Sequence, residues 1–353
     1  MARALMRAAL RRSLDQVKYV QPTRLDEAGD AVSRVYRQVE RDFGMLAPPV
    51  ALHSPAPGPL AASWLMLRES LLADGLVPRG TKEAVAAAVS LANSCPYCVA
   101  VHGATLQGLL GSTAAAAVAT GHLDSIGDPA VRAVARWALE SGRAADQPAE
   151  PPFAREQAPE IIGVAVTFQY LNRMVNVFLD DSPLPPAVPL PARRGVLRVL
   201  GRFLGATAEG RHQPGAALDL LPPAPLPPDL WWAAGSPHVA EAFARAAAAI
   251  ELAGDRHVPA AVRDAVGTRL AGWDGQQLGL SRAWLADEVR QLPAAEQPSA
   301  RLALLSALAA FQIDRSVIEE FRGVQPDDEA LVATTAWASM AAARRVGGWL
   351  AIG

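Results

Sequence analysis

Cysteine is scarce in this chain, which has 2 cysteines among 353 residues. So few thiols exclude the disulfide-rich scaffold of a small secreted domain. Acidic and basic residues nearly balance at a net charge of −2. No global field therefore favours nucleic acid or an anionic membrane surface. We expect neither nucleic acid nor a membrane as a partner.

Long uninterrupted apolar runs are also missing. The longest apolar window, residues 161–179, carries Gln169, Asn172 and Arg173, which makes it too polar for a membrane span. The N-terminal segment, residues 1–20, is basic and helical in its period. It lacks the apolar core and the cleavage site of a secretory signal. A cytoplasmic location is the expectation that follows.

What the chain has in abundance is helix-forming sequence. Aromatic residues make up only 6% of it, and much of its 51% hydrophobic content is alanine, the strongest helix former. The alternating pattern of strands, with period 2 and β-branched residues, is scarce throughout. Helical periodicity is clear in residues 61–74, 81–92, 96–110, 113–120, 129–142 and 159–179. The sequence predicts an all-α fold.

Proline marks the expected division of the chain. Residues 181–230 are proline-rich and enclose one short amphipathic stretch, 193–204, so we expect a linker with a short helix there. On either side we expect a helical unit, residues 49–180 with both cysteines and residues 231–353 with none. Residues 1–48 are predicted to form an N-terminal helical arm.

A weak internal repeat indicates that the second unit is a copy of the first. Segment 77–85 resembles segment 258–266, an offset of 181 residues, because a Val-Pro pair opens each and an acidic-Ala-Val triplet closes each. At that offset the positions of the two cysteines and of the histidine after them hold Gln276, Gly279 and Ala283. The second copy is therefore expected to keep the fold and to lack the chemistry.

The two cysteines, Cys95 and Cys98, stand three residues apart, and His102 follows four residues later. On a helix at about 100° per residue these three side chains share one face. Pro96 suits the first turn of a helix, with Ser94 or Cys95 as the cap, so we expect the helix to begin at the thiols. Its free N–H groups and positive dipole end then predict a lowered thiol pKa.

Glu83 lies twelve residues before the first cysteine, about 18 Å away if both were on one straight helix. Thr81 is a good N-cap for the helix that carries Glu83, and Asn93-Ser94 interrupts the helical pattern after it. The break allows the chain to fold back as an antiparallel pair of helices. Glu83 would then face His102 across the pair.

Thiol, imidazole and carboxylate in this arrangement form a nucleophile, a base and a group that orients the base. A thiolate attacks a peroxide oxygen and becomes a sulfenic acid, and a second thiol condenses with it to a disulfide. Spacing alone leaves the order of the thiols open, but Cys98 lies one helical turn from His102 and is favoured as the attacking thiol. Cys95, at the helix start that we expect to be more exposed, is then the resolving thiol. Glu83 orients or charges His102 in this relay.

The spacing Glu-x11-Cys-x2-Cys-x3-His is carried by Glu83, Cys95, Cys98 and His102. This motif resembles the signature of the AhpD-like alkylhydroperoxidases in the carboxymuconolactone decarboxylase superfamily. The resemblance covers roughly residues 55–180 and includes the segment 166–174, which looks like the family's helix with an Asn-Arg pair. It implies an all-helical fold, homo-oligomers and a hydroperoxide substrate. It also implies a cysteine-based peroxidase that a dithiol donor recycles, with no cofactor.

The chain departs from the family pattern at Tyr97, where some members carry a histidine as a further relay group, so the fine proton path stays open. The chain is also about twice as long as one family domain. Residues 231–353 therefore resemble a degenerate AhpD-like copy, whose packing could replace one contact between subunits. For Asn172 and Arg173, which could line an interface or the site, a structural role is favoured.

Several alternatives stay open. The four motif residues could bind structural zinc, but such sites usually recruit a second cysteine or histidine pair, and we expect no metal. The thiols could also be buried without a role. At the level of function, the competitors are a redox-sensing or interaction protein switched by a Cys95–Cys98 disulfide and a non-redox lactone hydrolase or decarboxylase. The intact thiol pair argues against the last of these.

Overall fold

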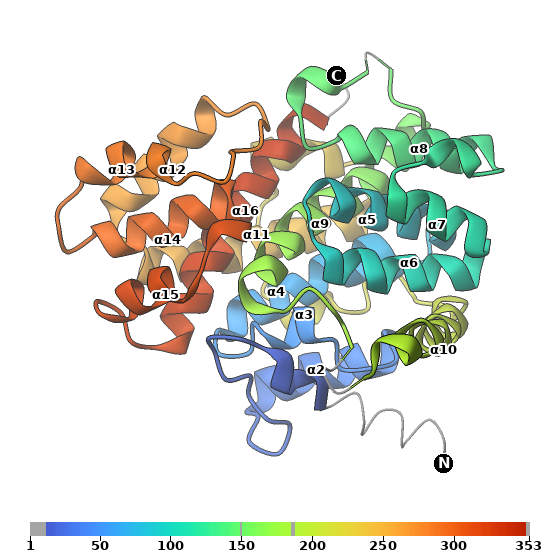
Figure 1. The fold of residues 1–353 in the computed structure, drawn as a ribbon, viewed down its shortest axis with the longest axis horizontal. Helices are drawn as coiled ribbons and strands as arrows, with labels where there is room; N and C mark the ends of the chain where they lie inside the picture. The colour runs from blue at the N-terminus through green and yellow to red at the C-terminus, as the bar shows by residue number, and fades with distance from the viewer. Residues whose placement is uncertain (1–11, 149, 185–187, 351–353) are drawn as a thin grey trace.

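The computed structural model describes residues 12–148, 150–184 and 188–350, and all its regular elements over these ranges are helices (Figure 1). The predicted all-α class is confirmed. Of the expected N-terminal arm, residues 1–11 lie outside the described residues. The helices are α2 (Asp30–Asp42), α3 (Pro48–Ala51), α4 (Pro57–Leu67), α5 (Arg79–Ala92), α6 (Pro96–Leu110), α7 (Ser112–Thr120), α8 (Pro129–Glu140), α9 (Ala158–Phe178), α10 (Leu190–Ala208), α11 (Pro237–His257), α12 (Ala260–Ala271), α13 (Ala283–Arg290), α14 (Gln297–Leu308), α15 (Arg315–Arg322) and α16 (Asp328–Leu350).

Shorter helical turns join the longer helices. A π-helix, η2 (Arg68–Leu72), continues α4. The 3₁₀ turns are η1 (Arg12–Gln16), η3 (Leu123–Ser125), η4 (Ala144–Asp146), η5 (Arg155–Gln157), η6 (Leu218–Leu220), η7 (Pro228–Ala233) and η8 (Ala310–Gln312).

Proline sets many of the helix starts. It occupies one of the first two positions of α4, α6, α8, α9, α10, α11 and α14, where its fixed φ fits and its missing N–H is not needed. The prediction of Thr81 as an N-cap is wrong. The helix α5 begins at Arg79 instead, with Pro78 in the cap position at φ −58° and ψ 143°.

Equivalent helices of the two expected copies pack against each other. The helix α4 packs on α11, and α9 packs on α16. The helices α5 and α12 both begin directly after a Val-Pro pair, and Pro259 before α12 has φ −54° and ψ 145°, nearly the values of Pro78. These correspondences support the expected duplication.

The second copy lacks the helix that carries the thiols in the first. Gln276 and Gly279, the positions that match the two cysteines, lie in the irregular segment between α12 and α13. Ala283, which matches His102, is the first residue of α13. At the matching positions the second half therefore has neither the helix start nor the reactive side chains of the first.

The helix expected as a short piece of linker is a long packed element. The helix α10 spans 19 residues and packs along α6 (Figure 1). The contact is close because glycines meet there: a Cβ added to Gly108 would lie 3.1 Å from the Cα of Gly205. Such a close backbone approach leaves no room for a side chain. This helix thus forms part of the surroundings of the thiols.

Buried apolar side chains of both halves belong to one continuous core. It runs from Val20 to Leu350 and includes the facing sides of α4, α9, α11 and α16. Within the described ranges, no helix has both the length and the apolar character needed to cross a membrane.

Candidate active site

The helix α6 begins at the thiols. Cys95 is its N-cap and Pro96 its first residue. Ser94 has a φ of 50°, a left-handed conformation that residues other than glycine rarely adopt. The N–H of Cys95 donates to the carbonyl of Ser90 at 2.9 Å. This tight turn reverses the chain, so that α6 packs back along α5.

The reversal brings Glu83 and His102 together. Nδ1 of His102 lies 2.7 Å from Oε2 of Glu83, and the two side chains are only 8% and 1% exposed. The imidazole also stands edge-on against the ring of Phe168 on α9, with ring centroids 4.6 Å apart. The histidine is therefore fixed from two sides, by a carboxylate on α5 and by an aromatic ring on α9.

Arg79 holds the other oxygen of the same carboxylate. Its Nε and Nη2 both donate to Oε1 of Glu83, at 2.9 and 2.7 Å. Burial acts to raise the pKa of Glu83, but the charges and hydrogen bonds of Arg79 and His102 outweigh it, so the pKa is lowered. Sequence analysis missed Arg79, although its spacing of four residues from Glu83 on one helix is typical of an ion pair.

Both thiols are buried, Cys95 at 0% and Cys98 at 3% exposure. The expectation that Cys95 is the more exposed thiol is therefore wrong. Burial raises the pKa of the Cys98 thiol, and the hydrogen bond and charge of Cys95 act in the same direction against a hydrogen bond from Asn172. The prediction of a lowered pKa fails for Cys98, because burial from water costs the thiolate more than the helix start supplies.

Asn172 ties α9 to the turn between α5 and α6. It is fully buried, its Nδ2 donates to Oγ of Ser90 at 3.0 Å, and its Oδ1 accepts from Nδ2 of Asn93 at 3.0 Å. It also forms a hydrogen bond with Cys98, and the two ties to Ser90 and Asn93 fit the structural role that was favoured for it. Tyr97 is buried, and this burial raises its pKa, which keeps the phenol protonated.

Arg173 points away from the thiols toward the second half. Its Nε donates to the carbonyl of Ala307 on α14 at 2.9 Å, and its guanidinium lies over the ring of Trp273. Burial lowers the pKa of Arg173 to about 10. The structure therefore gives this arginine the packing role that was favoured for it.

A cavity of about 250 Å³ reaches Cys98 and His102. Its lining is almost entirely apolar and comes from α4, α6, α9, α10, the segment before α4 and residues 183–184. The contribution of α10 consists of Val196, Val199, Leu200 and Leu204. A space of this size and character suits a compact organic molecule. Sequence reasoning did not predict that α10 walls the site.

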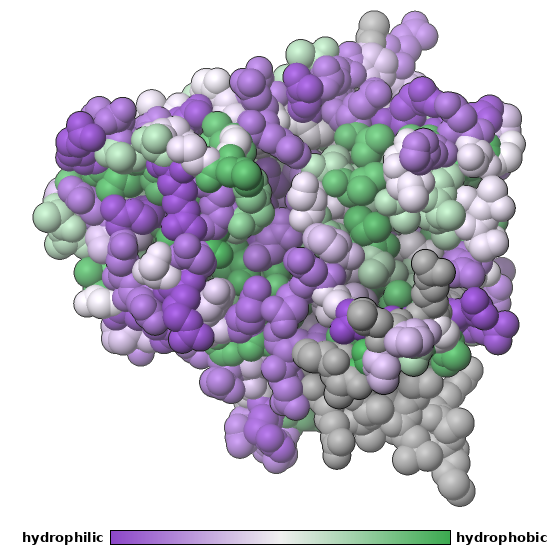
Figure 2. Space-filling model, viewed as in Figure 1, coloured by the Kyte–Doolittle hydropathy of each residue, from purple (hydrophilic) through white to green (hydrophobic). Residues whose placement is uncertain are grey.

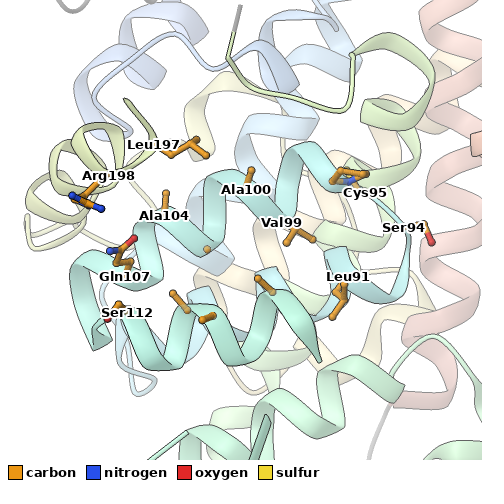
Figure 3. Close-up of a pocket in the computed structure, with 15 residues that line it drawn as sticks. Leu91, Ser94, Cys95, Val99, Ala100, Ala104, Gln107, Ser112, Leu197 and Arg198 are labelled. Atoms are coloured by element: carbon orange, nitrogen blue, oxygen red, sulfur yellow. The ribbon is translucent and has the colours of Figure 1, made fainter. Parts of the chain in front are cut away.

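A second, wider hollow reaches Cys95 and forms a groove along α6 with a volume of about 860 Å³ (Figure 3). Its lining follows α6 from Cys95 to Gln107 and is completed by α7 and by Leu197 and Arg198 of α10. Figure 2 shows hydrophobic residues gathered on the surface over α5 and α6. Among the described residues, none lines both this groove and the cavity at Cys98.

Within the part of the chain that the structure describes, no three His, Cys, Asp or Glu side chains are grouped so that they could hold a metal ion. The zinc alternative therefore has no ligand set there.

Comparison with known proteins gives three likenesses. The model of the carboxymuconolactone decarboxylase family matches residues 59–140, which include the thiols and His102. An alkyl hydroperoxide reductase of Mycobacterium tuberculosis is 38% identical over 335 residues, which are 95% of each chain. A crystal structure described as an alkylhydroperoxidase AhpD core, from an uncharacterized peroxidase-related protein of Ralstonia eutropha, is 24% identical with a TM-score of 0.44. It covers 53% of this chain and 97% of its own. A relative that is 38% identical over 95% of both chains, together with the family match over the thiol segment, shows that the chain belongs to the carboxymuconolactone decarboxylase family.

Proposed function

We propose that this chain is an alkylhydroperoxidase-like enzyme that reduces organic hydroperoxides with the Cys95 and Cys98 thiols and is recycled by a dithiol donor. The observation that carries the proposal is the buried contact between Glu83 and His102, one helical turn from Cys98 and beside the apolar cavity. The name of the Mycobacterium tuberculosis relative, an alkyl hydroperoxide reductase, supports the same activity.

The first step converts the Cys98 thiol to a sulfenic acid. Because the lowered pKa keeps Glu83 ionised, its Oε2 accepts a hydrogen bond from Nδ1–H of His102. The Nε2 atom is then the basic nitrogen and takes the thiol proton. The Cys98 thiolate attacks the terminal oxygen of the hydroperoxide, the O–O bond breaks, and the alkoxide takes the proton from His102 and leaves as an alcohol.

The raised pKa of Cys98 explains why such a base is needed. A buried thiol with a raised pKa is almost fully protonated near neutral pH, so the reactive thiolate forms only when a neighbouring group removes the proton. The position of His102 four residues after Cys98 on the same helix supplies that group.

The second and third steps restore the enzyme. The Cys95 thiol attacks the Cys98 sulfenic sulfur, so that a disulfide forms and water leaves. A dithiol donor then reduces this disulfide by two electrons and becomes a disulfide itself. The contact of Cys95 with Cys98 in the reduced chain supports the condensation.

Turnover with cumene hydroperoxide and dithiothreitol tests this function. We expect Cys98→Ser to abolish turnover, and we expect dimedone to trap a sulfenic acid on Cys98 in the Cys95→Ser variant. A Ser125→Ala variant, altered at an exposed position in η3 outside both hollows, is the control and should keep full activity. Turnover that survives Cys98→Ser would contradict the mechanism.

The same samples separate the competing functions. A change of oligomer size between the reduced and oxidised forms, without peroxide turnover, would favour the redox-sensing alternative. Absence of both a Cys95–Cys98 disulfide and turnover would favour the non-redox chemistry of the superfamily.

A further inference from the structure

We propose that the two reagents reach the thiol pair from opposite faces of α6, the hydroperoxide through the cavity at Cys98 and the thiol donor along the groove at Cys95. This inference rests on the proposed function, because it assigns a separate approach to each half of the redox cycle. It adds a donor site, the groove along α6, to the peroxide site.

Helix geometry separates the two approaches. At about 100° per residue, measured from Cys95, the groove-lining residues of α6 fall between 0° and about 180°. The cavity-lining residues of α6 fall between about 200° and about 340° on the same scale. Cys95 lies at the edge of the first arc and Cys98 within the second, so neighbouring sulfurs belong to different hollows.

Size decides which reagent uses which hollow. The cavity at Cys98 measures about 250 Å³, enough for a compact hydroperoxide and too small for a donor that must also bring a second thiol on a larger carrier. The groove at Cys95 measures about 860 Å³ and extends to Gln107. Twelve residues of helix correspond to about 18 Å, so an extended donor fits along it.

The chemistry favours attack at Cys95 as well. The donor thiol loses its proton to the solvent and its thiolate attacks the Cys95 sulfur. The Cys95–Cys98 bond breaks, and Cys98 leaves as a thiolate that is protonated through His102, whose Nε2 takes up a proton from the solvent in exchange. The second donor thiol then attacks the donor sulfur of the mixed disulfide, which releases Cys95 and the oxidised donor. The leaving thiolate is thus the one that has a proton source beside it.

The side chain of Cys95 is fully buried in the reduced chain. The residues that cover it must therefore move before the donor can reach its sulfur. The residue before it, Ser94, is exposed, lines the groove and holds a left-handed φ of 50°. A left-handed conformation is strained for a residue other than glycine, so a change at this turn relieves strain while it uncovers Cys95.

Charge indicates the form in which the donor binds. The charged residue in the groove lining is Arg198, which is exposed on α10 and faces the far end of the groove from Cys95 (Figure 3). A cationic side chain at this place attracts the anionic portion of an extended donor whose thiol lies at Cys95. The expected occupant is therefore an extended, partly anionic thiol donor.

Two substitutions on α6 test the separation. Gly103 lines the groove, and a Cβ there would meet nothing within 4 Å, so Gly103→Leu fills the groove without disturbing the packing. Val101→Phe, two residues away, fills the cavity instead. Gly267→Leu is the matched control, because Gly267 is also a helical glycine with nothing within 4 Å, on α12.

Each half-reaction is measured by itself. Reduced protein is mixed with cumene hydroperoxide to time disulfide formation. Protein oxidised beforehand with diamide is mixed with a reduced acidic peptide that carries a Cys-x-x-Cys pair to time disulfide reduction. We expect Gly103→Leu to slow reduction by about tenfold or more and to leave oxidation within about twofold, and Val101→Phe to do the reverse, because exchange rates depend on access to the sulfur.

The outcomes are distinct. Equal slowing of both half-reactions by Gly103→Leu, or unchanged reduction in that variant, would overturn the separate approaches. Because diamide forms the disulfide without peroxide, a protein that fails to react with cumene hydroperoxide would overturn the proposed function alone, and the reduction assay would still report on the groove.

A second measurement tests the charge of the occupant. The oxidised protein is reduced with two extended peptides that carry the same Cys-x-x-Cys pair, one with acidic (anionic) and one with basic (cationic) flanking residues. We expect Arg198→Glu to slow the anionic thiol by about threefold or more relative to the cationic one, because the local potential changes sign. An unchanged ratio of the two rates would remove Arg198 from the donor site.

Discussion

At the residue scale, one carboxylate joins the catalytic histidine of the proposed mechanism to an arginine at the start of α5. Oε1 of Glu83 accepts two hydrogen bonds from Arg79, and Oε2 faces His102. Arg79 does not contact the thiols in this arrangement and acts through Glu83, so we assign it a positioning role. The side chain of Arg79 is 15% exposed, which allows its replacement without opening the core.

We expect Arg79→Gln to lower kcat/KM for cumene hydroperoxide by about tenfold to a hundredfold, less than the roughly hundredfold or greater loss expected when the base itself is removed. Arg79→Lys should retain more activity, because it keeps the charge and loses only the paired geometry. The control is Arg136→Gln, which removes an exposed arginine paired with exposed Asp124. A rate equal to that of the control would show that Glu83 needs no such partner.

The lowered pKa of Glu83 predicts how the activity of these variants changes with pH. Glu83 has a lowered pKa in the folded chain, so activity that needs its carboxylate is lost as the pH falls through that value. Without Arg79 the raising effect of burial on the pKa of Glu83 remains, and the acid limb of the rate profile of Arg79→Gln should move to higher pH.

The stability supplied by the ionised Glu83 carboxylate is full above its unfolded pKa of about 4.3 and is lost on acidification. The difference in the free energy of unfolding in urea between the unaltered protein and Arg79→Gln should therefore shrink toward low pH.

Much of this residue arrangement could be predicted from the sequence. The spacing of Cys95, Cys98 and His102 and the break before them led to the helix start and to the facing of Glu83 and His102, because such features depend on local geometry. Burial could not be predicted in the same way. The pKa of Cys98 is raised by packing from distant segments, and no local pattern reports that packing.

At the element scale, α10 determines the shape of the cavity. It was expected as a short helix within a linker, because its surroundings are rich in proline. Its glycines do not count as apolar positions in a helical pattern, so the sequence did not indicate a packed face there. These glycines nevertheless allow α10 to lie close against α6. A Cβ on Gly201 would lie 2.5 Å from the carbonyl oxygen of Ala104, a distance at which the two backbones must separate.

We expect Gly201→Ala to push α10 outward and to raise the KM for cumene hydroperoxide several-fold, since Leu200 and Leu204 retreat from the cavity. Hydrogen peroxide, which has no apolar part to bind, should be affected much less. Gly195→Ala is the matched control on the same helix, because a Cβ there meets nothing within 4 Å. If Gly195→Ala and Gly201→Ala give the same KM, then α10 does not shape the substrate site.

At the scale of the whole molecule, the half without thiols supports the half with them. Nε2 of Gln277 donates to the carbonyl of Ala92 at 2.7 Å, at the end of α5 and just before the turn that leads to Cys95. Arg173 makes the reverse connection from α9 to Ala307. The sequence indicated a repeat, but it could not show that the copies share a core, because such contacts join residues more than a hundred positions apart.

The shared core predicts that the two halves unfold together, although their proline-rich connection suggested separate units. A Cβ on Gly254 of α11 would lie 2.2 Å from Cδ1 of Trp337 on α16, so Gly254→Ala should cost about 1 to 3 kcal/mol of stability through overpacking. Gly267→Ala, at an open helical position, is the control and should be neutral or slightly stabilising.

Urea unfolding is followed by circular dichroism, which reports all the helices, and by the reaction of Cys95 and Cys98 with a thiol reagent, which reports only the first half. For a common core, Gly254→Ala shifts both curves to lower urea by the same amount, although the substitution lies far along the chain from the thiols. Thiol curves that stay in place while the helical signal shifts would instead establish two independent domains.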